Sequence, residues 1–336
     1  MTDSIIFKEN NGTGIILLNR PKTLNALNLQ MAELFLIQLK KWQKDKKIQR
    51  VLLTGEGKAF CAGGDIKAMF FSSAVSDLKK KFLFKEYALN YTISQFSKPY
   101  LSIWDGTVMG GGIGISIYGN VRIATEKSKF AMPETAIGFF PDVGGSFFLS
   151  RIKKNVGLYL GLTGQVIGAN DMIFFGLATH FQYSQNIKKL KFHYINSGSL
   201  PPSEKINKKS SKIIDNLEFI EKTFQGDLNS IMKKLEKSKS EFAKKTFDHL
   251  TKRCPMSLAI TVELISRAKK LSLKECLEME FQLSQHIVYR DDFNNGVEAV
   301  LVSKKHNPTW NPESIHDIDI KEAKKLFQNH TEKIGL

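Results

Sequence analysis

The sequence predicts an α/β fold of repeated strand–strand–helix units, followed by a helical C-terminal portion. Short apolar and β-branched runs alternate with helical stretches, and the glycine-rich segments CAGGD (61–65) and MGGGIG (109–114) follow two of those runs. From Asn216 onward, apolar residues recur almost wholly at helical spacing. This alternation favours stacked right-handed turns in a layered core. We expect a core over residues 1–200 and a helical region over 201–336.

The first elements are a hairpin and a helix. Residues 4–20 hold the runs SIIF and GIILLN around an Asn-Asn-Gly turn signal, and Pro21 ends the second run. Asn28 is suited to cap the helix that follows. The apolar residues of this helix recur at helical spacing: Met31, Leu34, Phe35, Leu39 and Trp42.

The strand–helix pattern then repeats. RVLLTG (50–55) and PYLSIWDG (99–106) read as buried strands, with a helical stretch over 75–97 between them. Gly110–Gly112 and Gly114 open a further helix, and VRIATEKSKFAM (121–132) returns as strands. Residues 197–212 are rich in Pro, Ser and Lys, which predicts a linker or surface loop.

The chain is basic but otherwise ordinary in composition. Its 336 residues include 49 Lys and Arg against 33 Asp and Glu, a net charge of +16, and 42% are hydrophobic, which argues against disorder. The surplus could attract nucleic acid, anionic lipid or a small polyanion. Because acidic residues interleave with the lysines and no RNA-binding motif or zinc finger occurs, solvated helix faces are favoured over a nucleic-acid surface.

Several classes of site lack their usual residues. Cys61, Cys254 and Cys276 form no CxxC pair, so neither a disulfide framework nor a zinc site is expected. HExxH, GxxxxGK[ST] and GxSxG motifs are absent, and the glycine run fails the GxGxxG spacing. No apolar run approaches the ~20 residues of a membrane helix, and the start resembles no signal peptide. We expect a soluble, unprocessed, cytoplasmic protein.

The glycine-rich segments and two acids are the candidate chemistry. Two such loops could present backbone N–H groups to an oxyanion, or could simply be tight turns. In PETAIGFFPDVGG, Glu134 and Asp142 lie near Phe139 and Phe140, where desolvation would raise a carboxyl pKa and suit acid–base catalysis. Helix-cap or surface carboxylates are the competing interpretation.

Taken together, FCAGGD, GGGIG and FAMPETAIGFFPDVGG resemble the enoyl-CoA hydratase/isomerase (crotonase) superfamily, and most closely its 3-hydroxyisobutyryl-CoA hydrolase branch. The similarity runs from LNRPKTLNAL through EYALN, CPMSLAIT and EMEFQLSQ to RDDFNNGVEAVLVSKKHNPTW. The order and spacing of these motifs make the resemblance specific. It implies the crotonase fold, with C-terminal helices that cover the active site or mediate oligomer contacts.

The resemblance also implies roles for residues of the glycine loops. The N–H groups of Gly64 and Gly111 correspond to the family's oxyanion hole, which polarises the thioester carbonyl. Glu86 in EYALN corresponds to a glutamate that contacts the acyl group. The candidates for coenzyme A contacts are Ala62, Asp65, Ile66 and Lys67.

One departure of this sequence from the superfamily pattern distinguishes hydration from hydrolysis. Hydratases of this superfamily hold water between two glutamates, but here the first position is Gly114 and only the second, Glu134, is acidic. Glu134 with Asp142 instead matches the hydrolase branch, in which Glu134 would act as nucleophile or general base. The resemblance thus implies hydrolysis of 3-hydroxyisobutyryl-CoA in valine breakdown.

The resemblance further implies the partners and leaves alternatives. Coenzyme A belongs to the substrate, so no cofactor and no metal are expected, and neither nucleic acid nor membrane is an expected partner. A homo-oligomer is possible. The alternatives are an enoyl-CoA hydratase or isomerase that uses Glu134 alone, and a non-catalytic protein that binds acyl-CoA or RNA.

Overall fold

The computed structural model describes residues 3–73, 76–206, 210–328 and 333–336. Contacts divide the chain into two compact units, each assembled from three stretches of sequence. Unit 1 comprises Met1–Asp65, Lys85–Ala131 and Val166–Ser211. Unit 2 comprises Ile66–Phe84, Met132–Gln165 and Lys212–Leu336.

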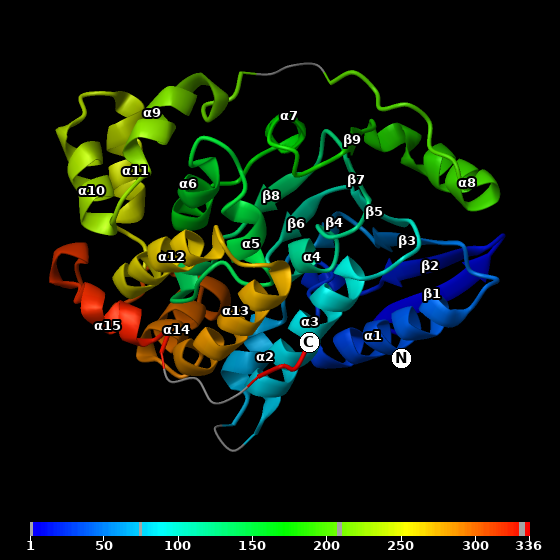
Figure 1. Ribbon diagram of the computed structural model, residues 1–336, viewed down its shortest axis with the longest axis horizontal. Coiled ribbons are helices and arrows are strands. Elements are labelled where there is room, and N and C mark those ends of the chain that lie inside the picture. The colour runs from blue at the N-terminus through cyan, green and yellow to red at the C-terminus, as the bar shows by residue number, and fades with distance from the viewer. Residues whose placement is uncertain (1–2, 74–75, 207–209, 329–332) are drawn as a thin grey trace. The chain divides into compact units, whose positions relative to one another are not determined.

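Unit 1 contains two sheets, whose strands lie side by side in Figure 1. The six-stranded sheet has the order β1 (Ile5–Asn10), β2 (Thr13–Leu18), β3 (Arg50–Gly55), β5 (Tyr100–Trp104), β7 (Val121–Ala124) and β9 (His180–Phe181). The three-stranded sheet has the order β4 (Ala59–Cys61), β6 (Thr107–Met109) and β8 (Lys129–Ala131). All neighbouring strands are parallel except β1 and β2.

The strands confirm the predicted repeats. β1 and β2 form the hairpin, and Asn11 and Gly12 adopt positive φ angles of 46° and 71° at its turn, as a two-residue turn with the twist of the strands requires. The pairs β3–β4, β5–β6 and β7–β8 each place one strand in the larger sheet and the next in the smaller one. The second strand of each repeat therefore lies in the smaller sheet.

The helices of unit 1 pack on the two sheets or connect their strands. They are α1 (Leu29–Lys44), α4 (Gly111–Gly114), α7 (Ala169–Phe174) and α8 (Ile187–Ser197), with 3₁₀ turns η1 (Pro21–Thr23) and η3 (Ser184–Asn186). Ile187, Leu190 and Tyr194 of α8 pack against a buried cluster from the strands, namely Leu52, Leu101, Ile103 and Ile123. Burial of this apolar surface holds α8 to the sheet.

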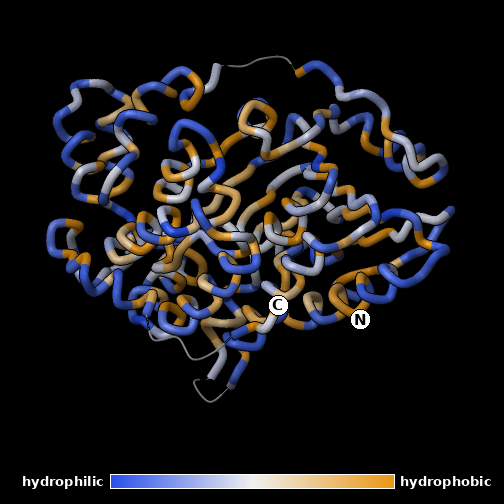
Figure 2. Tube along the Cα trace, in the orientation of Figure 1, coloured by the Kyte–Doolittle hydropathy of each residue, from blue (hydrophilic) through white to orange (hydrophobic). Residues whose placement is uncertain are grey.

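Helix α1 shows how its sequence pattern becomes packing. Asn28 caps it by accepting a hydrogen bond from the Met31 N–H at 2.8 Å. Trp42 is fully buried and donates from Nε1 to Glu9 of β1 at 2.7 Å. Leu34, predicted on the apolar face, is instead 41% exposed. Orange and blue segments alternate along α1 in Figure 2, as expected for a helix with one buried side.

Unit 2 is helical. Its helices are α2 (Ile66–Phe71), α5 (Gly145–Leu149), α6 (Val156–Thr163), α9 (Leu217–Thr223), α10 (Leu228–Lys237), α11 (Glu241–Leu250), α12 (Pro255–Ala268), α13 (Leu273–Ile287), α14 (Asp291–Val297) and α15 (Ile320–Lys325). Shorter turns are η2 (Glu134–Ile137), η4 (Ile214–Asn216), the π-helical η5 (Glu298–Val302) and η6 (Ile315–Asp317). α6 is almost wholly buried, which explains why its sequence VGLYLGLT has no polar face.

Two predicted segments differ in detail. The helical stretch 75–97 is α3 (Leu78–Ser94), and the predicted start at Val75 lies outside the described residues. α3 contributes residues to both units, with Glu86 in unit 1. The expected linker 197–212 begins with the last residue of α8, and its residues 207–209 also lie outside the described part.

The compact units do not follow a single boundary near residue 200. Residues 132–165 group with the C-terminal helices because α5, α6 and α12 pack together, and residues 66–84 do so because α2 contacts α14 and η5. A linear pattern cannot show such an exchange of segments. Whether 1–200 and 201–336 act as domains stays a prediction.

Candidate active site

The loop after β4 holds Gly64 by backbone pairing. The Leu27 N–H donates to Gly63 O at 2.9 Å, and the Asp65 N–H donates to Leu27 O at 2.8 Å. Gly64 thus forms an isolated parallel bridge with Leu27. In such a bridge successive N–H groups alternate in direction. The N–H of Gly64 therefore points away from Leu27.

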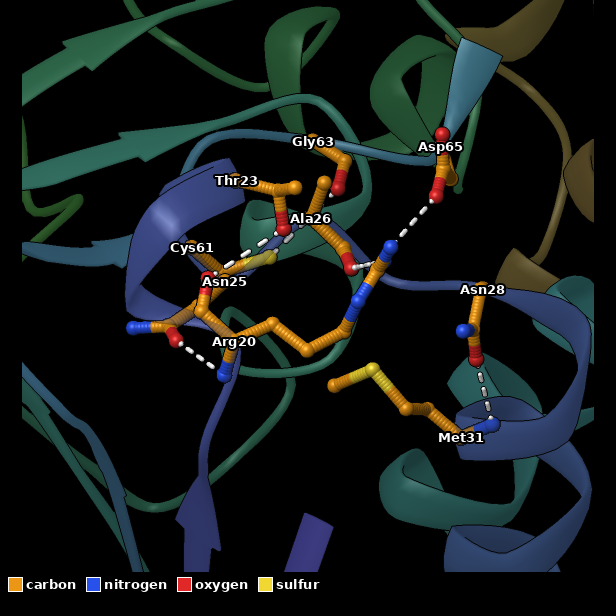
Figure 3. A network of polar contacts seen from close by, with 9 residues as sticks. All are labelled: Arg20, Thr23, Asn25, Ala26, Asn28, Met31, Cys61, Gly63 and Asp65. Atoms are coloured by element: carbon orange, nitrogen blue, oxygen red, sulfur yellow. Dashed lines mark hydrogen bonds and ion pairs between the residues drawn. The ribbon is translucent and has the colours of Figure 1, made fainter. Parts of the chain in front are cut away.

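Side chains from the LNRPKTLNAL segment support the same loop (Figure 3). The guanidinium of Arg20 binds the Asp65 carboxylate at 2.8 Å and the carbonyl of Ala26 at 2.6 Å. Asn25 accepts from the Arg20 N–H at 2.8 Å and donates to the carbonyls of Glu56 and Ala59. This network ties the segment before α1 to both ends of the β3–β4 connection.

Gly111 lies against Gly64 and Glu86. A Cβ placed on Gly111 would lie 3.1 Å from the Gly64 nitrogen and 2.2 Å from Oε1 of Glu86. Only glycine fits at this position without displacing one of those atoms. Glu86 is 2% exposed. The structure thus brings together three of the predicted site residues within unit 1.

The N–H groups of Gly64 and Gly111 are the two predicted oxyanion donors. Among the described residues, none accepts a hydrogen bond from the N–H of Gly64 or of Gly111. Gly111 is the first residue of α4, where N–H groups lack partners in the helix. Both donors are therefore available to a ligand, as an oxyanion hole requires.

The Cys61 thiol lies next to this loop. Cys61 is fully buried, and burial raises the pKa of its thiol to about 12. Its Sγ contacts the carbonyl of Gly63 at 3.5 Å. The neutral thiol fills space beside the glycine loop, as a small apolar side chain would.

The sequence analysis missed a polar residue one turn beyond Glu86. Asn90 is 0% exposed, and neither its Oδ1 nor its Nδ2 hydrogen-bonds to any described residue. Residues four apart share a helix face, so Asn90 lies on the face of α3 that carries Glu86. Leu83, Glu86 and Tyr87 are also buried, and this helical spacing is the signal that could have identified Asn90.

Unit 2 buries the predicted acid pair. Glu134 begins η2 and is 7% exposed, and Asp142 is 6% exposed. Oε2 of Glu134 accepts no hydrogen bond from the described residues. Burial raises the pKa of Glu134 well above its usual range, and the nearby charge of Asp142 raises it further. This environment supports the desolvated interpretation over that of surface carboxylates, and it suits a nucleophile or general base.

The backbone around Glu134 is fixed by the rest of unit 2. The Cys254 N–H donates to the carbonyl of Thr135 at 3.0 Å, and the Thr135 hydroxyl donates to Leu162 O at 3.0 Å. A Cβ at Gly138 would lie 2.3 Å from the carbonyl oxygen of Asp292 in α14. α12, α6 and α14 thereby hold the turn that carries Glu134.

A third buried carboxyl belongs to Glu280 of α13, which the sequence analysis did not single out. Glu280 is 0% exposed and accepts hydrogen bonds from the backbone of Gly144 and Ser146. Burial raises its pKa to about 8. Cys276 and Ser284, one turn away on each side, are buried as well, so helical spacing places Glu280 on the inner face.

The predicted coenzyme A contacts fall in both units. Ala62 and Asp65 belong to unit 1, whereas Ile66 and Lys67 begin α2 in unit 2. Lys67 is exposed, while Asp65 is partly buried and paired with Arg20. Among the described residues, no group of three or more His, Cys, Asp and Glu side chains could hold a metal ion.

Two features are those expected of an α/β enzyme that stabilises an oxyanion with its backbone: glycine N–H groups without an acceptor among the described residues, and a helical unit that buries an acid pair. The chain belongs to the enoyl-CoA hydratase/isomerase family, whose model matches residues 13–327. The predicted crotonase fold is thereby confirmed. Solved structures agree in fold over nearly the whole chain.

Curated relatives and solved structures are similar to this chain over most of its length. The chain is 39% identical to the mitochondrial 3-hydroxyisobutyryl-CoA hydrolase of Danio rerio, over 98% of this chain and 90% of the relative. Identity is 37% to that of Homo sapiens, over 99% and 89%. A structure described as an enoyl-CoA hydratase from Rhodobacter sphaeroides has TM-score 0.91 and 30% identity, and covers 97% of both chains. A carnitinyl-CoA dehydratase from Mycobacterium thermoresistibile has TM-score 0.91 and 32% identity, over 99% and 98%.

Proposed function

We propose that this protein hydrolyses the thioester of 3-hydroxyisobutyryl-CoA, releasing 3-hydroxyisobutyrate and coenzyme A. The names of the relatives at 36–42% identity support the substrate. The observation that carries the reaction type is the buried Glu134 beside Asp142, with the non-acidic Gly114 where hydratases have a second glutamate. One carboxylate suffices to attack a thioester or to activate water against it.

The proposed steps use the groups described above. The N–H groups of Gly64 and Gly111 stabilise negative charge on the thioester oxygen as it forms. The Glu134 carboxylate attacks the carbonyl carbon, the C–S bond breaks, and water then hydrolyses the acyl anhydride. In the general-base variant Glu134 takes a proton from the attacking water. Coenzyme A leaves as a stable thiolate, so proton donation to it is not demanding.

The remaining site residues have proposed positioning roles. Asp142 orients water or the substrate hydroxyl, and Glu86 contacts the acyl hydroxyl. Ala62, Asp65, Ile66 and Lys67 contact the coenzyme A portion. For Asp65 we propose contact through its backbone, because its carboxylate is paired with Arg20 at 2.8 Å.

The direct test is release of free thiol from a panel of short acyl-CoA esters, with 3-hydroxyisobutyryl-CoA among them. We expect this ester to be the preferred substrate. Glu134→Gln should lower kcat by about 10³-fold because the amide can neither attack nor accept a proton. Binding of the ester, measured by calorimetry, should change little. Near wild-type turnover by Glu134→Gln would sink the assignment.

Enoyl-CoA hydration or isomerisation is the second candidate, because the two structures at TM-score 0.91 are described as a hydratase and a dehydratase. In that case Glu134 alone would shuttle the proton. Absorbance of an enoyl thioester follows hydration, whereas a thiol reagent follows hydrolysis. Loss of enoyl absorbance without thiol release would favour the second candidate.

Apart from the acyl-CoA substrate, the partners and the cellular location of the protein stay predictions. We predict a cytoplasmic location, no cofactor, no nucleic-acid or membrane partner, and a homo-oligomer. The relatives' names place those proteins in mitochondria and so lend the cytoplasmic location no support. Within the described residues, no helix is both long and apolar enough to cross a membrane.

A further inference from the structure

The loop that carries Asp142 has an unfavourable backbone conformation. Val143 is a buried β-branched residue with φ of 54°, and Gly144 follows with φ of 77°. A left-handed conformation at a β-branched residue costs roughly 1–2 kcal/mol. The Gly145 N–H donates to the Asp142 carbonyl at 2.6 Å, which closes the turn. Such a conformation persists only where surrounding contacts enforce it.

The Glu280 carboxyl group supplies those contacts. Its Oε2 accepts from the Gly144 N–H at 2.6 Å, and its Oε1 accepts from the Ser146 N–H at 3.0 Å. The Ser146 hydroxyl donates to Oε1 as well. Three donors from a five-residue turn thus converge on one side chain, which is itself fully buried on α13.

We propose that Glu280 is a positioning residue that holds the turn at Asp142–Ser146 in its strained conformation and so sets the place of the Asp142 carboxylate. It acts through Asp142 and contacts no substrate. The inference rests on the proposed hydrolysis for its kinetic readout, but the conformation of the turn can be measured whether or not the protein is a hydrolase.

Glu280→Gln is the informative variant because glutamine has the same shape. Its amide oxygen can accept from Ser146, but its NH₂ group cannot accept from the Gly144 N–H. A repulsive donor–donor contact then lies two residues from Asp142. The matched control is Glu278→Gln on the same helix, since Glu278 also accepts backbone hydrogen bonds, from Ile334, Gly335 and Leu336.

Two measurements test the inference on the full chain. Hydrogen–deuterium exchange should show faster exchange over residues 142–146 in Glu280→Gln than in wild type or Glu278→Gln. With 3-hydroxyisobutyryl-CoA, kcat should fall about 10- to 100-fold in Glu280→Gln, the size of effect that a small misplacement of a catalytic group produces. KM should change much less, and Glu278→Gln should match wild type.

A double-mutant cycle separates positioning from general loss of structure. In an Asp142→Asn background, Glu280→Gln should lower kcat less than about 2-fold, because the group through which it acts is already lost. The same fold-change in both backgrounds would overturn the inference. Unchanged exchange at 142–146, or unchanged kcat in the single variant, would overturn it equally.

A variant that does not fold and a wild type without hydrolase activity each have a further test. If Glu280→Gln does not fold, Ser146→Ala removes only the hydroxyl hydrogen bond and should show the same pattern with a smaller decrease in kcat; an unchanged exchange rate and kcat in that variant count against the inference. If wild type hydrolyses no acyl-CoA ester, the proposed function fails. The exchange comparison then still decides whether Glu280 holds the turn.

Discussion

At the scale of single residues, the predicted catalytic residues of the two units have opposite properties. Gly64 and Gly111 contribute backbone N–H groups, and the contact of Gly111 with Glu86 leaves no room for a side chain. Glu134 contributes a carboxyl group whose burial raises its pKa. The proposed reaction would therefore depend on the lack of a side chain at Gly111 and on the desolvation of Glu134.

Gly111→Ala should lower kcat by about 10²- to 10³-fold, the usual effect of losing one oxyanion donor. Its Cβ would lie 2.2 Å from Oε1 of Glu86, so the backbone or the carboxyl group must shift. Steady-state thiol release measures the effect. Gly168→Ala is the control, because nothing lies within 4 Å of a Cβ there and its φ is −101°. Equal activity of both variants would contradict the assignment of Gly111.

The pH dependence of kcat/KM should reveal the acid pair. The proposed reaction needs ionised Glu134, so the acid limb of this profile should have an apparent pKa above the usual 4.5 of a glutamate. The charge of Asp142 contributes to this increase, so Asp142→Asn should move the midpoint to lower pH, besides lowering kcat. A midpoint that stays in place would show that the two groups are not coupled.

Asn90→Leu should stabilise the protein and impair its activity. Removing a buried amide whose polar atoms have no described hydrogen-bond partner should raise the free energy of unfolding by about 1–3 kcal/mol. If Asn90 binds substrate beside Glu86, kcat/KM should fall. Asn25→Leu is the control, because Asn25 is equally buried but fully hydrogen-bonded, and it should be destabilising. Denaturant unfolding and thiol release measure both effects.

At the scale of elements, two of the predicted site residues lie in short turns, whereas Glu86 lies on the long helix α3. Glu134 lies in the four-residue η2 and Gly111 in the four-residue α4. Neither element is stable alone, since isolated helices shorter than about 12–15 residues are marginal in water. Packing against larger helices and strands must therefore hold them.

Gly138→Ala tests the packing of η2 against α14. The new Cβ would lie 2.3 Å from the carbonyl oxygen of Asp292, and φ is +71°. The free energy of unfolding should fall by more than the roughly 1–2 kcal/mol of the left-handed backbone alone. Gly176→Ala isolates that backbone contribution, because its φ is +73° and nothing lies within 4 Å. Equal losses in thermal or denaturant unfolding would contradict the importance of the contact.

At the scale of the whole molecule, the net charge of +16 has a simpler explanation than nucleic acid. Positive potential favours binding of the pyrophosphate and 3′-phosphate of coenzyme A. Lysines elsewhere in the chain lie among acidic residues. We expect no saturable binding of a labelled single-stranded RNA at about 0.2 M salt, measured by fluorescence anisotropy. Tight binding with a steep log–log salt slope would instead support the RNA-binding alternative.

Local patterns predicted most elements correctly, including the hairpin at Asn11–Gly12 and the cap at Asn28. For Glu134 and Asp142 local patterns left two interpretations open, and the structure supports the buried pair over surface carboxylates. Helical spacing grouped Leu34 with the buried residues of α1, but its side chain is 41% exposed. Helical periodicity does not say how wide the covered face of a helix is.

The sequence by itself determined the α/β class, the family motifs and the residue types available for chemistry, because these depend on order and spacing along the chain. Only the tertiary structure decided that Gly111 meets Glu86, that Arg20 pairs with Asp65, and that residues 66–84 and 132–165 group with the C-terminal helices. It also brought Glu280 into hydrogen-bond contact with Gly144 in the turn that follows Asp142, and Glu280 is 138 residues from Asp142 in sequence (280 − 142). The physical reason is that such contacts form by burial and hydrogen bonding between distant segments, which local periodicity does not encode.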